Sequence, residues 1–159
     1  MDDRPLSGRE ELAGVRRQLL AGDVSPPGAA DGVGASWQRV QRAGLSPELC
    51  AADAMLEAAA LQLVRAENER LIAFALPELE NLHQQIAGSG SAVLLADAHG
   101  VILERQGDPR FRERSQQVAL SPGACWGEGA RGTNAIGVAL AEGRCASVHG
   151  PEHFLECNT

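Results

Sequence analysis

The sequence predicts an α+β fold, in which helices flank an antiparallel sheet. Three observations support this: an amphipathic stretch over residues 53–87, a strand–turn–strand pattern over residues 92–103, and a glycine-rich loop that enters a short helix near residue 133. Each pattern shows the periodicity of its element, about 3.6 residues for a helix and two for a strand. With 159 residues, the chain is long enough for one modest domain or a domain with an appendage.

Composition limits the classes of function. Aromatic residues make up 3% of the chain and tyrosine is absent, so a core must depend on Ala, Leu, Val and Ile. The net charge of −7 argues against a nucleic-acid-binding surface, which needs a basic face. No apolar run approaches the roughly 20 residues that span a bilayer, and the acidic start has no signal-peptide core. We therefore expect a cytoplasmic chain without membrane or direct nucleic-acid contacts, whose cysteines are reduced thiols.

The first part of the chain predicts short helices separated by a linker. Residues 9–20 have apolar side chains at helical spacing, and residues 22–34 are rich in glycine and proline, as in a flexible linker. Ser36 is suited to cap a helix that runs to about Ala43, because its hydroxyl can accept a free N–H of the first turn. A further helix is expected to begin at 46–48, where serine precedes proline.

Trp37 lies in the second of these helices. We expect it to pack the short helices against the next element, and a contact with a partner protein is the alternative. The helical segments and linker form a predicted N-terminal region over residues 1–52. Residues 53–159 then form the predicted second domain with its leading helix.

Residues 53–87 form the longest predicted helix. Its apolar stripe is wide, with a polar break at 67–70, and Pro77 is expected to kink or split the helix because it lacks an N–H. A helix of this kind must bury its stripe against a sheet or against the same helix of a second chain. We therefore expect self-association, as a homodimer, through this stretch.

A β-hairpin is predicted after the helix. The apolar run Ala92–Ala96 is typical of a strand buried on both faces, and residues 101–103 form the returning strand. Between them, Asp97 and Gly100 occupy the first and fourth positions that a type I turn favours. Asp97 is therefore expected to form the turn and not to act as an acid catalyst.

The segment 126–154 joins a glycine-rich loop to a helix and a short strand. Thr133 is the predicted N-cap of the helix, and Gly143 is expected to end it in a left-handed conformation. Residues 144–149 alternate as in a strand. The predicted role of Gly132 and Gly137 is to let this segment approach the sheet closely.

These residues carry a resemblance to a known family. The chain resembles the GAF domain in the N-terminal sensor region of sigma-54-dependent transcriptional activators of the acetoin catabolism regulator type. The similarity begins near residue 36 and covers most of the chain from there onwards. The matching residues are Ser36, Trp37, Arg39, Gly44, Leu45, Pro47, Trp126, Glu128, Gly132 to Gly137, Ala139 to Gly143, Val148 to Gly150, and Glu152 to Phe154.

The resemblance implies a sensor of a small metabolite, such as a hydroxyketone or an alcohol, that controls an activator. It also implies downstream ATPase and DNA-binding domains in full-length relatives, and neither is recognisable in this chain. The family's GAF sheet continues for two strands beyond the matching segment, so we expect a sheet truncated at its C-terminus with an exposed edge. The candidate ligand-binding residues are Trp126, Thr133, Asn134, Ile136, Val148 and His149.

Other chemistries find less support, and we expect no catalytic residue, metal or cofactor. Cys145, His149, His153 and Cys157 recur every four residues, but Gly150-Pro151 argues against the helix that would align them as zinc ligands. The glycine loop lacks the Lys-Ser/Thr of a phosphate-binding loop. Two alternatives remain open: a dimerisation or docking module without a ligand, and a cysteine-dependent GAF enzyme or redox sensor that uses Cys125.

Overall fold

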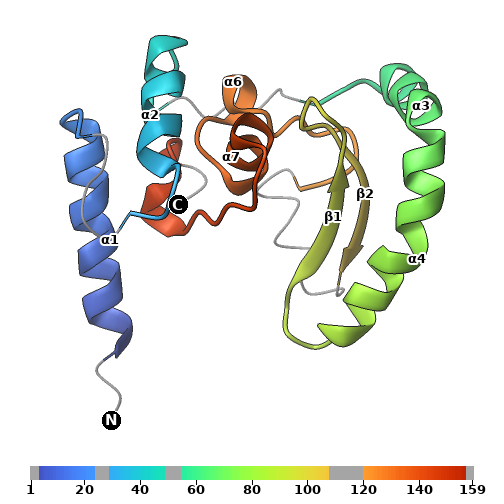
Figure 1. Cartoon of the computed structure of the whole chain (residues 1–159), viewed down its shortest axis with the longest axis horizontal. Helices are drawn as coiled ribbons and strands as arrows, with labels where there is room; N and C mark the ends of the chain where they lie inside the picture. The colour runs from blue at the N-terminus through green and yellow to red at the C-terminus, as the bar shows by residue number, and fades with distance from the viewer. Residues whose placement is uncertain (1–3, 24–28, 49–54, 108–119, 157–159) are drawn as a thin grey trace. The chain divides into compact units, whose positions relative to one another are not determined.

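The computed structural model describes residues 4–23, 29–48, 55–107 and 120–156 (Figure 1). The chain divides into two compact units, residues 1–52 with 126–159 and residues 53–125. The described residues contain helices and a two-stranded antiparallel sheet. This mixture confirms the α+β class. The predicted domain boundary after residue 52 and the predicted loss of C-terminal strands stay predictions.

The first unit combines segments from both ends of the sequence. Its helices are α1, α2, α6 and α7, followed by a 3₁₀ turn, η1. Their bounds are Arg4–Leu20, Val33–Arg42, Glu128–Arg131, Ala135–Glu142 and Gly150–Glu152. Helix α1 lies against η1 (Figure 1).

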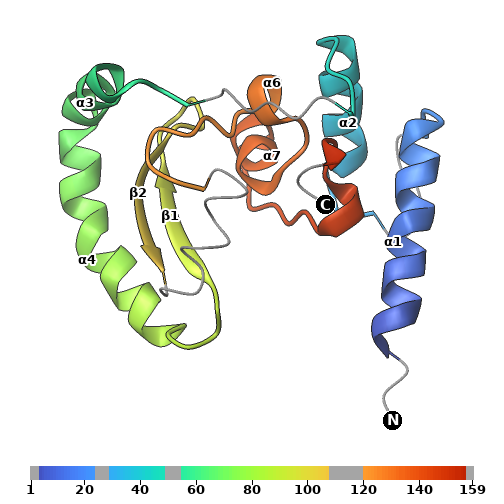
Figure 2. The same cartoon turned by 180° about the vertical axis from the view of Figure 1, so that it is seen from behind.

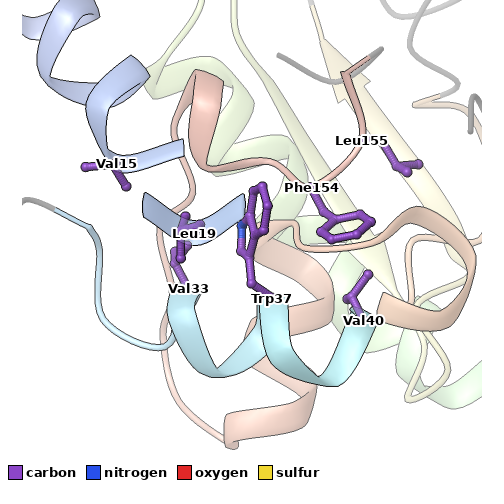
Figure 3. Close-up of a cluster of buried hydrophobic side chains, with 7 residues drawn as sticks. All are labelled: Val15, Leu19, Val33, Trp37, Val40, Phe154 and Leu155. Atoms are coloured by element: carbon purple, nitrogen blue, oxygen red, sulfur yellow. The ribbon is translucent and has the colours of Figure 1, made fainter. Parts of the chain in front are cut away.

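A hydrophobic cluster holds this unit together (Figure 3). It consists of the buried side chains of Val15, Leu19, Val33, Trp37, Val40, Phe154 and Leu155. Trp37 and Phe154 meet edge to face, with ring centroids 4.9 Å apart and an interplanar angle of 65°, a favoured aromatic geometry. Trp37 therefore packs the short helices together, as predicted, but its aromatic partner Phe154 comes from the C-terminal segment and not from the next element of the chain.

Helix α2 begins earlier than predicted. Its N-cap is Gly32, which has a left-handed φ of 84°, and Ser36 lies inside the helix with no capping role. The cap prediction was wrong because the chain turns at a glycine, where no side-chain cap is needed to start the helix. The helix ends where predicted, with Ala43 as its C-cap, and Gly44 follows it with φ 80°. The helix expected to begin at 46–48 falls mostly on residues outside the described ranges.

In the second unit, the predicted long helix consists of two helices (Figure 2). Helix α3 spans Ala58–Glu67 and α4 spans Glu69–Gln85, with Asn68 between them. The side-chain amide of Asn68 donates to the carbonyl of Val64 at 2.9 Å, the same carbonyl that accepts the Asn68 backbone N–H at 3.1 Å. Pro77 lies inside α4 and does not split it.

The hairpin forms as predicted, with a longer second strand. Strand β1, Ala92–Ala96, pairs antiparallel with β2, Ile102–Gly107, and the register shifts between Leu95 and Ala96. The Asp97 carboxylate accepts the N–H groups of His99 at 2.8 Å and Val101 at 2.9 Å. Asp97 is therefore a turn former, as predicted.

Helix α4 packs on both strands of the hairpin. Ile72 and Leu79 are its buried side chains. All five residues of β1 are half-buried, so the prediction of a strand buried on both faces was wrong. Four large apolar side chains of α3 and α4 are exposed: Leu63, Leu71, Phe74 and Leu82.

Residues 144–149 follow α7 without forming a strand, and this prediction was wrong. In this segment Val148 packs against the hydrophobic cluster of the first unit, while Arg144 lies 3.9 Å from the carboxylates of Asp31 and Glu142. Among the helices of the described ranges, none has the length and apolar character needed to cross a membrane.

Candidate functional site

The glycine-rich loop forms the short helix α6 and places two large side chains against each other. Trp126 is buried, and the guanidinium carbon of Arg131 lies 5.4 Å from the centroid of its ring. This distance is within the range of a cation–π interaction. Arg131 is itself 5% exposed, so the loop carries a buried positive charge beside an indole face.

Two glycines allow the loop to pack closely. Gly132 has φ 63°, and a Cβ atom there would lie 2.9 Å from Cβ of Phe154. At Gly137 an added Cβ would lie 2.9 Å from Cγ of Glu128. Both glycines thus serve close approach, as predicted, but their partners are Phe154 and Glu128 and not the sheet.

Asn134 is the N-cap of α7. Its Oδ1 accepts the N–H of Gly137 at 2.9 Å, and its Nδ2 donates to the carbonyls of Trp126 at 2.9 Å and Gly132 at 2.8 Å. An amide NH₂ has two donors, so both are used by the loop backbone. Asn134 therefore fixes the loop to the start of the helix. Gly143 ends α7 with φ 64°, as predicted.

Thr133 does not cap α7, so that prediction was wrong. Two residues suited to capping stand next to each other, and the extended backbone of Asn134 places its side chain over the first turn. Thr133 is instead fully buried, and its hydroxyl accepts a hydrogen bond of 2.8 Å from the hydroxyl of Ser36. This bond joins the loop to α2 through two side chains 97 positions apart.

Arg39 makes a second connection between α2 and the loop. Its Nε and one terminal nitrogen donate to the two carboxylate oxygens of Glu128 at 2.8 and 2.7 Å. The other terminal nitrogen donates to Glu142 in α7 at 2.9 Å. The Glu128 hydrogen bond is the main cause that raises the pKa of Arg39 above its usual value. The planar fork of an arginine suits this bidentate pairing, which a lysine cannot reproduce.

A buried carboxylate organises the C-terminal segment. Glu152 is 1% exposed, and its two oxygens accept the backbone N–H groups of Ala30 at 2.6 Å and His149 at 2.8 Å. The Glu152 carbonyl accepts the indole N–H of Trp37 at 2.8 Å. Since these hydrogen bonds satisfy its buried polar atoms, Glu152 has a structural role.

Two further side chains complete the surroundings of the cluster. Arg16 lies over the Trp37 ring at 5.4 Å and donates to the carbonyl of His153 at 2.6 Å. Burial lowers the pKa of His153, and its interaction with the backbone of Thr133 partly opposes that shift. Nδ1 of His153 has no hydrogen-bond partner in the described part of the chain.

The structure brings together some of the predicted ligand-binding residues. Trp126, Thr133 and Asn134 share the loop before α7, and Ile136 lies half-buried in the first turn of that helix. Val148 is half-buried against the hydrophobic cluster, and His149 is exposed beside η1. Binding by these six residues stays a prediction.

Sequence reasoning missed several residues that shape this site. Arg131 is the first, and nothing in the sequence distinguishes it from the other arginines. Ser36 and Arg39 belong to the recognised pattern, but their partners lie about 90 positions away, and no local signal identifies them.

The thiols and histidines form no metal site in the described residues, where no group of three or more His, Cys, Asp or Glu side chains gathers. Cys145 is exposed, and Cys157 lies outside the described residues. The thiol of Cys125 is half-buried and 3.8 Å from the carbonyl oxygen of His99.

Comparison with known families and proteins gives consistent matches. The family model described as the MimR N-terminal domain matches residues 10–158. The chain is 34% identical over 119 residues to the acetoin dehydrogenase operon transcriptional activator AcoR of Bacillus subtilis, covering 75% of this chain and 20% of that protein. It is 38% identical over 125 residues to the acetoin catabolism regulatory protein of Cupriavidus necator, covering 75% of this chain and 18% of that one.

The chain therefore spans about a fifth of the length of the curated relatives that it matches. Among solved structures, a chain of the E. coli DhaR(N)–DhaL complex superposes with a TM-score of 0.73 at 20% identity, covering 78% of this chain and 42% of that chain. This similarity supports the fold.

Proposed function

Because the chain belongs to the family of MimR N-terminal domains, we propose that it is the metabolite-sensing N-terminal region of a transcriptional activator. Its relatives are regulators of acetoin catabolism by name. The effector proposed here is a small metabolite such as a hydroxyketone or an alcohol. The proposed contacts are Trp126, Thr133, Asn134, Ile136, Val148 and His149.

One observation carries this proposal: the loop 126–134 is joined to α2 by side-chain interactions and not by chain connectivity. Ser36 binds Thr133, and Arg39 binds Glu128. A molecule that displaces the loop would change the energy of these bonds and so shift α2. Such a connection is what a sensor needs in order to report an occupied site elsewhere in a protein.

Trp126 provides a direct test of effector binding. Titration with acetoin and with 2,3-butanediol is expected to change tryptophan fluorescence in the wild type and to raise its unfolding temperature. The fluorescence change is expected to disappear in Trp126→Phe, in which Trp37 alone emits. A change that persists in this variant would place the effect at Trp37. The absence of any change in fluorescence and unfolding temperature across hydroxyketones, diols and alcohols would contradict the sensing proposal.

A dimerisation or docking module is the second candidate function. It is favoured by the exposed apolar side chains of α3 and α4, which include Leu63 and Phe74, 68% and 76% exposed. A second copy of this chain is the proposed partner, because exposed apolar patches mark association surfaces. Concentration-dependent association without effector binding would favour docking over sensing.

We propose no catalytic role. The thiol of Cys125 lies 3.8 Å from the carbonyl oxygen of His99, and no group of three or more His, Cys, Asp or Glu side chains gathers around it among the described residues. Replacement of Cys125 by serine is expected to leave effector binding unchanged.

In the full-length activator, the signal is proposed to pass to ATPase and DNA-binding domains in the cytoplasm, with no direct contact between this region and nucleic acid or membrane.

A further inference from the structure

Arg131 differs from the other buried charged residues of the described chain. Three charged side chains are buried there: Asp97, Arg131 and Glu152. Asp97 and Glu152 each accept two backbone N–H groups. Nε of Arg131 is buried and has no hydrogen-bond partner among the described residues. Arg131 is thus the buried charge for which the described residues provide no matching group.

The acidic residue closest in sequence cannot neutralise Arg131. Glu128 lies one helical turn earlier, but both of its carboxylate oxygens bind Arg39. None of the ion pairs found among the described residues includes Arg131. The end of α6 gives little compensation, because a helix of four residues has a small dipole.

Trp126 compensates the charge only in part. The indole contacts the guanidinium at 5.4 Å, and a cation–π contact returns a fraction of what burial of an unpaired ion costs. A guanidinium that stacks on a ring keeps the N–H donors at its edge free, and these form a planar fork that matches a carboxylate. One buried positive charge also matches a single negative charge better than a double one.

We propose that Arg131 is the anion-recognition residue of the sensor and that the effector, or its recognised part, is a small carboxylate. The carboxylate would bind edge-on to the guanidinium, with Trp126 as the wall beside it. This inference rests on the proposed sensing function and changes its effector class from a neutral hydroxyketone or alcohol to a small carboxylate, because a neutral effector would leave the buried charge unpaired.

Binding measurements with matched ligands test the proposal. Lactate and pyruvate carry the carboxylate, acetoin and 2,3-butanediol are neutral counterparts of similar size, and inorganic phosphate is a doubly charged competitor. Titration calorimetry of the 159-residue chain is expected to show that lactate or pyruvate binds more tightly than acetoin, 2,3-butanediol and phosphate. In Arg131→Met that affinity is expected to fall about 100-fold, as for a buried ion pair that loses one partner. The carboxylate affinity of Arg131→Lys is expected to lie between those of the wild type and Arg131→Met, because lysine keeps the positive charge and lacks the planar fork of donors.

Two controls separate recognition from folding. Arg42→Gln, at an exposed position at the end of α2, is expected to bind the carboxylate as the wild type does. The unfolding temperature of ligand-free Arg131→Met is expected to equal or exceed that of the wild type, because the substitution removes an unpaired buried charge and keeps an apolar stem beside Trp126. A marked fall in that temperature would show that Arg131 stabilises the fold itself and would overturn the proposal.

The remaining outcomes distinguish this inference from the sensing proposal. If acetoin or 2,3-butanediol binds the wild type and Arg131→Met equally well and no carboxylate binds more tightly, the chain senses a neutral metabolite and Arg131 does not recognise it. Preferential binding of phosphate would also overturn the choice of a carboxylate. If no compound of any class binds, both the inference and the sensing proposal fail.

Discussion

The two units of the chain are stabilised in different ways. In the unit of residues 1–52 and 126–159, the hydrogen bonds and aromatic contacts around Trp37 join positions more than 90 residues apart. In the unit of residues 53–125, a hairpin of neighbouring strands packs on the helix that precedes it. The first unit therefore depends on contacts between the two ends of the sequence. In the second, the contacts between distant residues, such as the bridge between Met55 and Ala124, stay within residues 53–125.

The two units also differ in the side chains that they bury and in those that they expose. The first buries polar groups in specific hydrogen bonds, as Thr133 and Glu152 do. The second leaves apolar side chains exposed on α3 and α4. Buried polar networks specify one arrangement and tolerate little change, whereas exposed apolar faces are suited to association. We infer that sensing resides in the first unit and self-association in the second.

The largest expected effect is the loss of the aromatic pair in the first unit. Trp37→Ala removes the contact with Phe154 and leaves a cavity, which should lower the free energy of unfolding by about 3–5 kcal/mol. The matched control is Leu71→Ala on the exposed face of α4, for which a change within about 0.5 kcal/mol is expected. Urea unfolding of both variants measures the difference. Equal effects would contradict the distinction between the two units.

A smaller effect is expected from Gly132→Ala. The new Cβ would lie 2.9 Å from Cβ of Phe154, at a backbone φ of 63°, so steric overlap and backbone strain add. A loss of about 1–3 kcal/mol is expected from the strain. Gly143→Ala is the comparison variant: its φ of 64° and ψ of 26° are left-handed, whereas Gly132 has ψ −160°, and no described atom lies near the added Cβ at Gly143. A smaller loss is therefore expected for Gly143→Ala, and equal losses in the two variants would contradict the strain and overlap assigned to Gly132.

The pH dependence of stability provides a third test. Burial lowers the folded-state pKa of His153 below its ordinary value of 6.5, so the unfolded state binds this proton more readily. His153 therefore allows full stability above pH 6.5, and stability falls as the pH drops below 6.5 towards the folded-state pKa. In His153→Gln the unfolding temperature is expected to fall less between pH 7 and pH 5 than it does in the wild type. Parallel curves for the variant and the wild type would show that His153 does not contribute.

The smallest effect on stability is expected at Phe74, which is 76% exposed. Phe74→Ser should change the free energy of unfolding by less than about 0.5 kcal/mol and weaken self-association of the chain. Sedimentation velocity at rising concentration measures that association. A wild type that stays monomeric at high micromolar concentration would contradict the proposed homodimer, and an equally associated variant would exclude this face of α4.

These contrasts also explain what the sequence could predict. The hairpin turn at Asp97 and the helix end at Gly143 follow from local chemistry, and both were predicted correctly. The choice between Thr133 and Asn134 as the cap depended on a distant partner, because Ser36 binds the Thr133 hydroxyl. Arg131 was missed for the same kind of reason. It stands out because it is buried without a charged partner among the described residues, and this can be recognised only in the folded structure.

Two predictions were wrong about conformation although they concerned the right segments: the site at which the long helix divides and the strand over residues 144–149. The long helix divides at Asn68, where a side-chain amide binds the backbone, and continues through Pro77. Residues 144–149 form no strand, and Val148 packs on the hydrophobic cluster of the first unit. In both cases the pattern identified the right segment, and the packed environment decided its conformation.

Native-state hydrogen exchange tests the central claim, that α2 and the segment 126–155 form one cooperative unit, most directly. In the wild type, amides of α2 and α7 are expected to exchange through a common opening with the same free energy. In Gly132→Ala, both helices should lose the same amount of protection, while β1 and β2 keep theirs. Loss of protection in α7 with unchanged protection in α2 would show that the bonds of Ser36 and Arg39 do not join them, and would contradict the account.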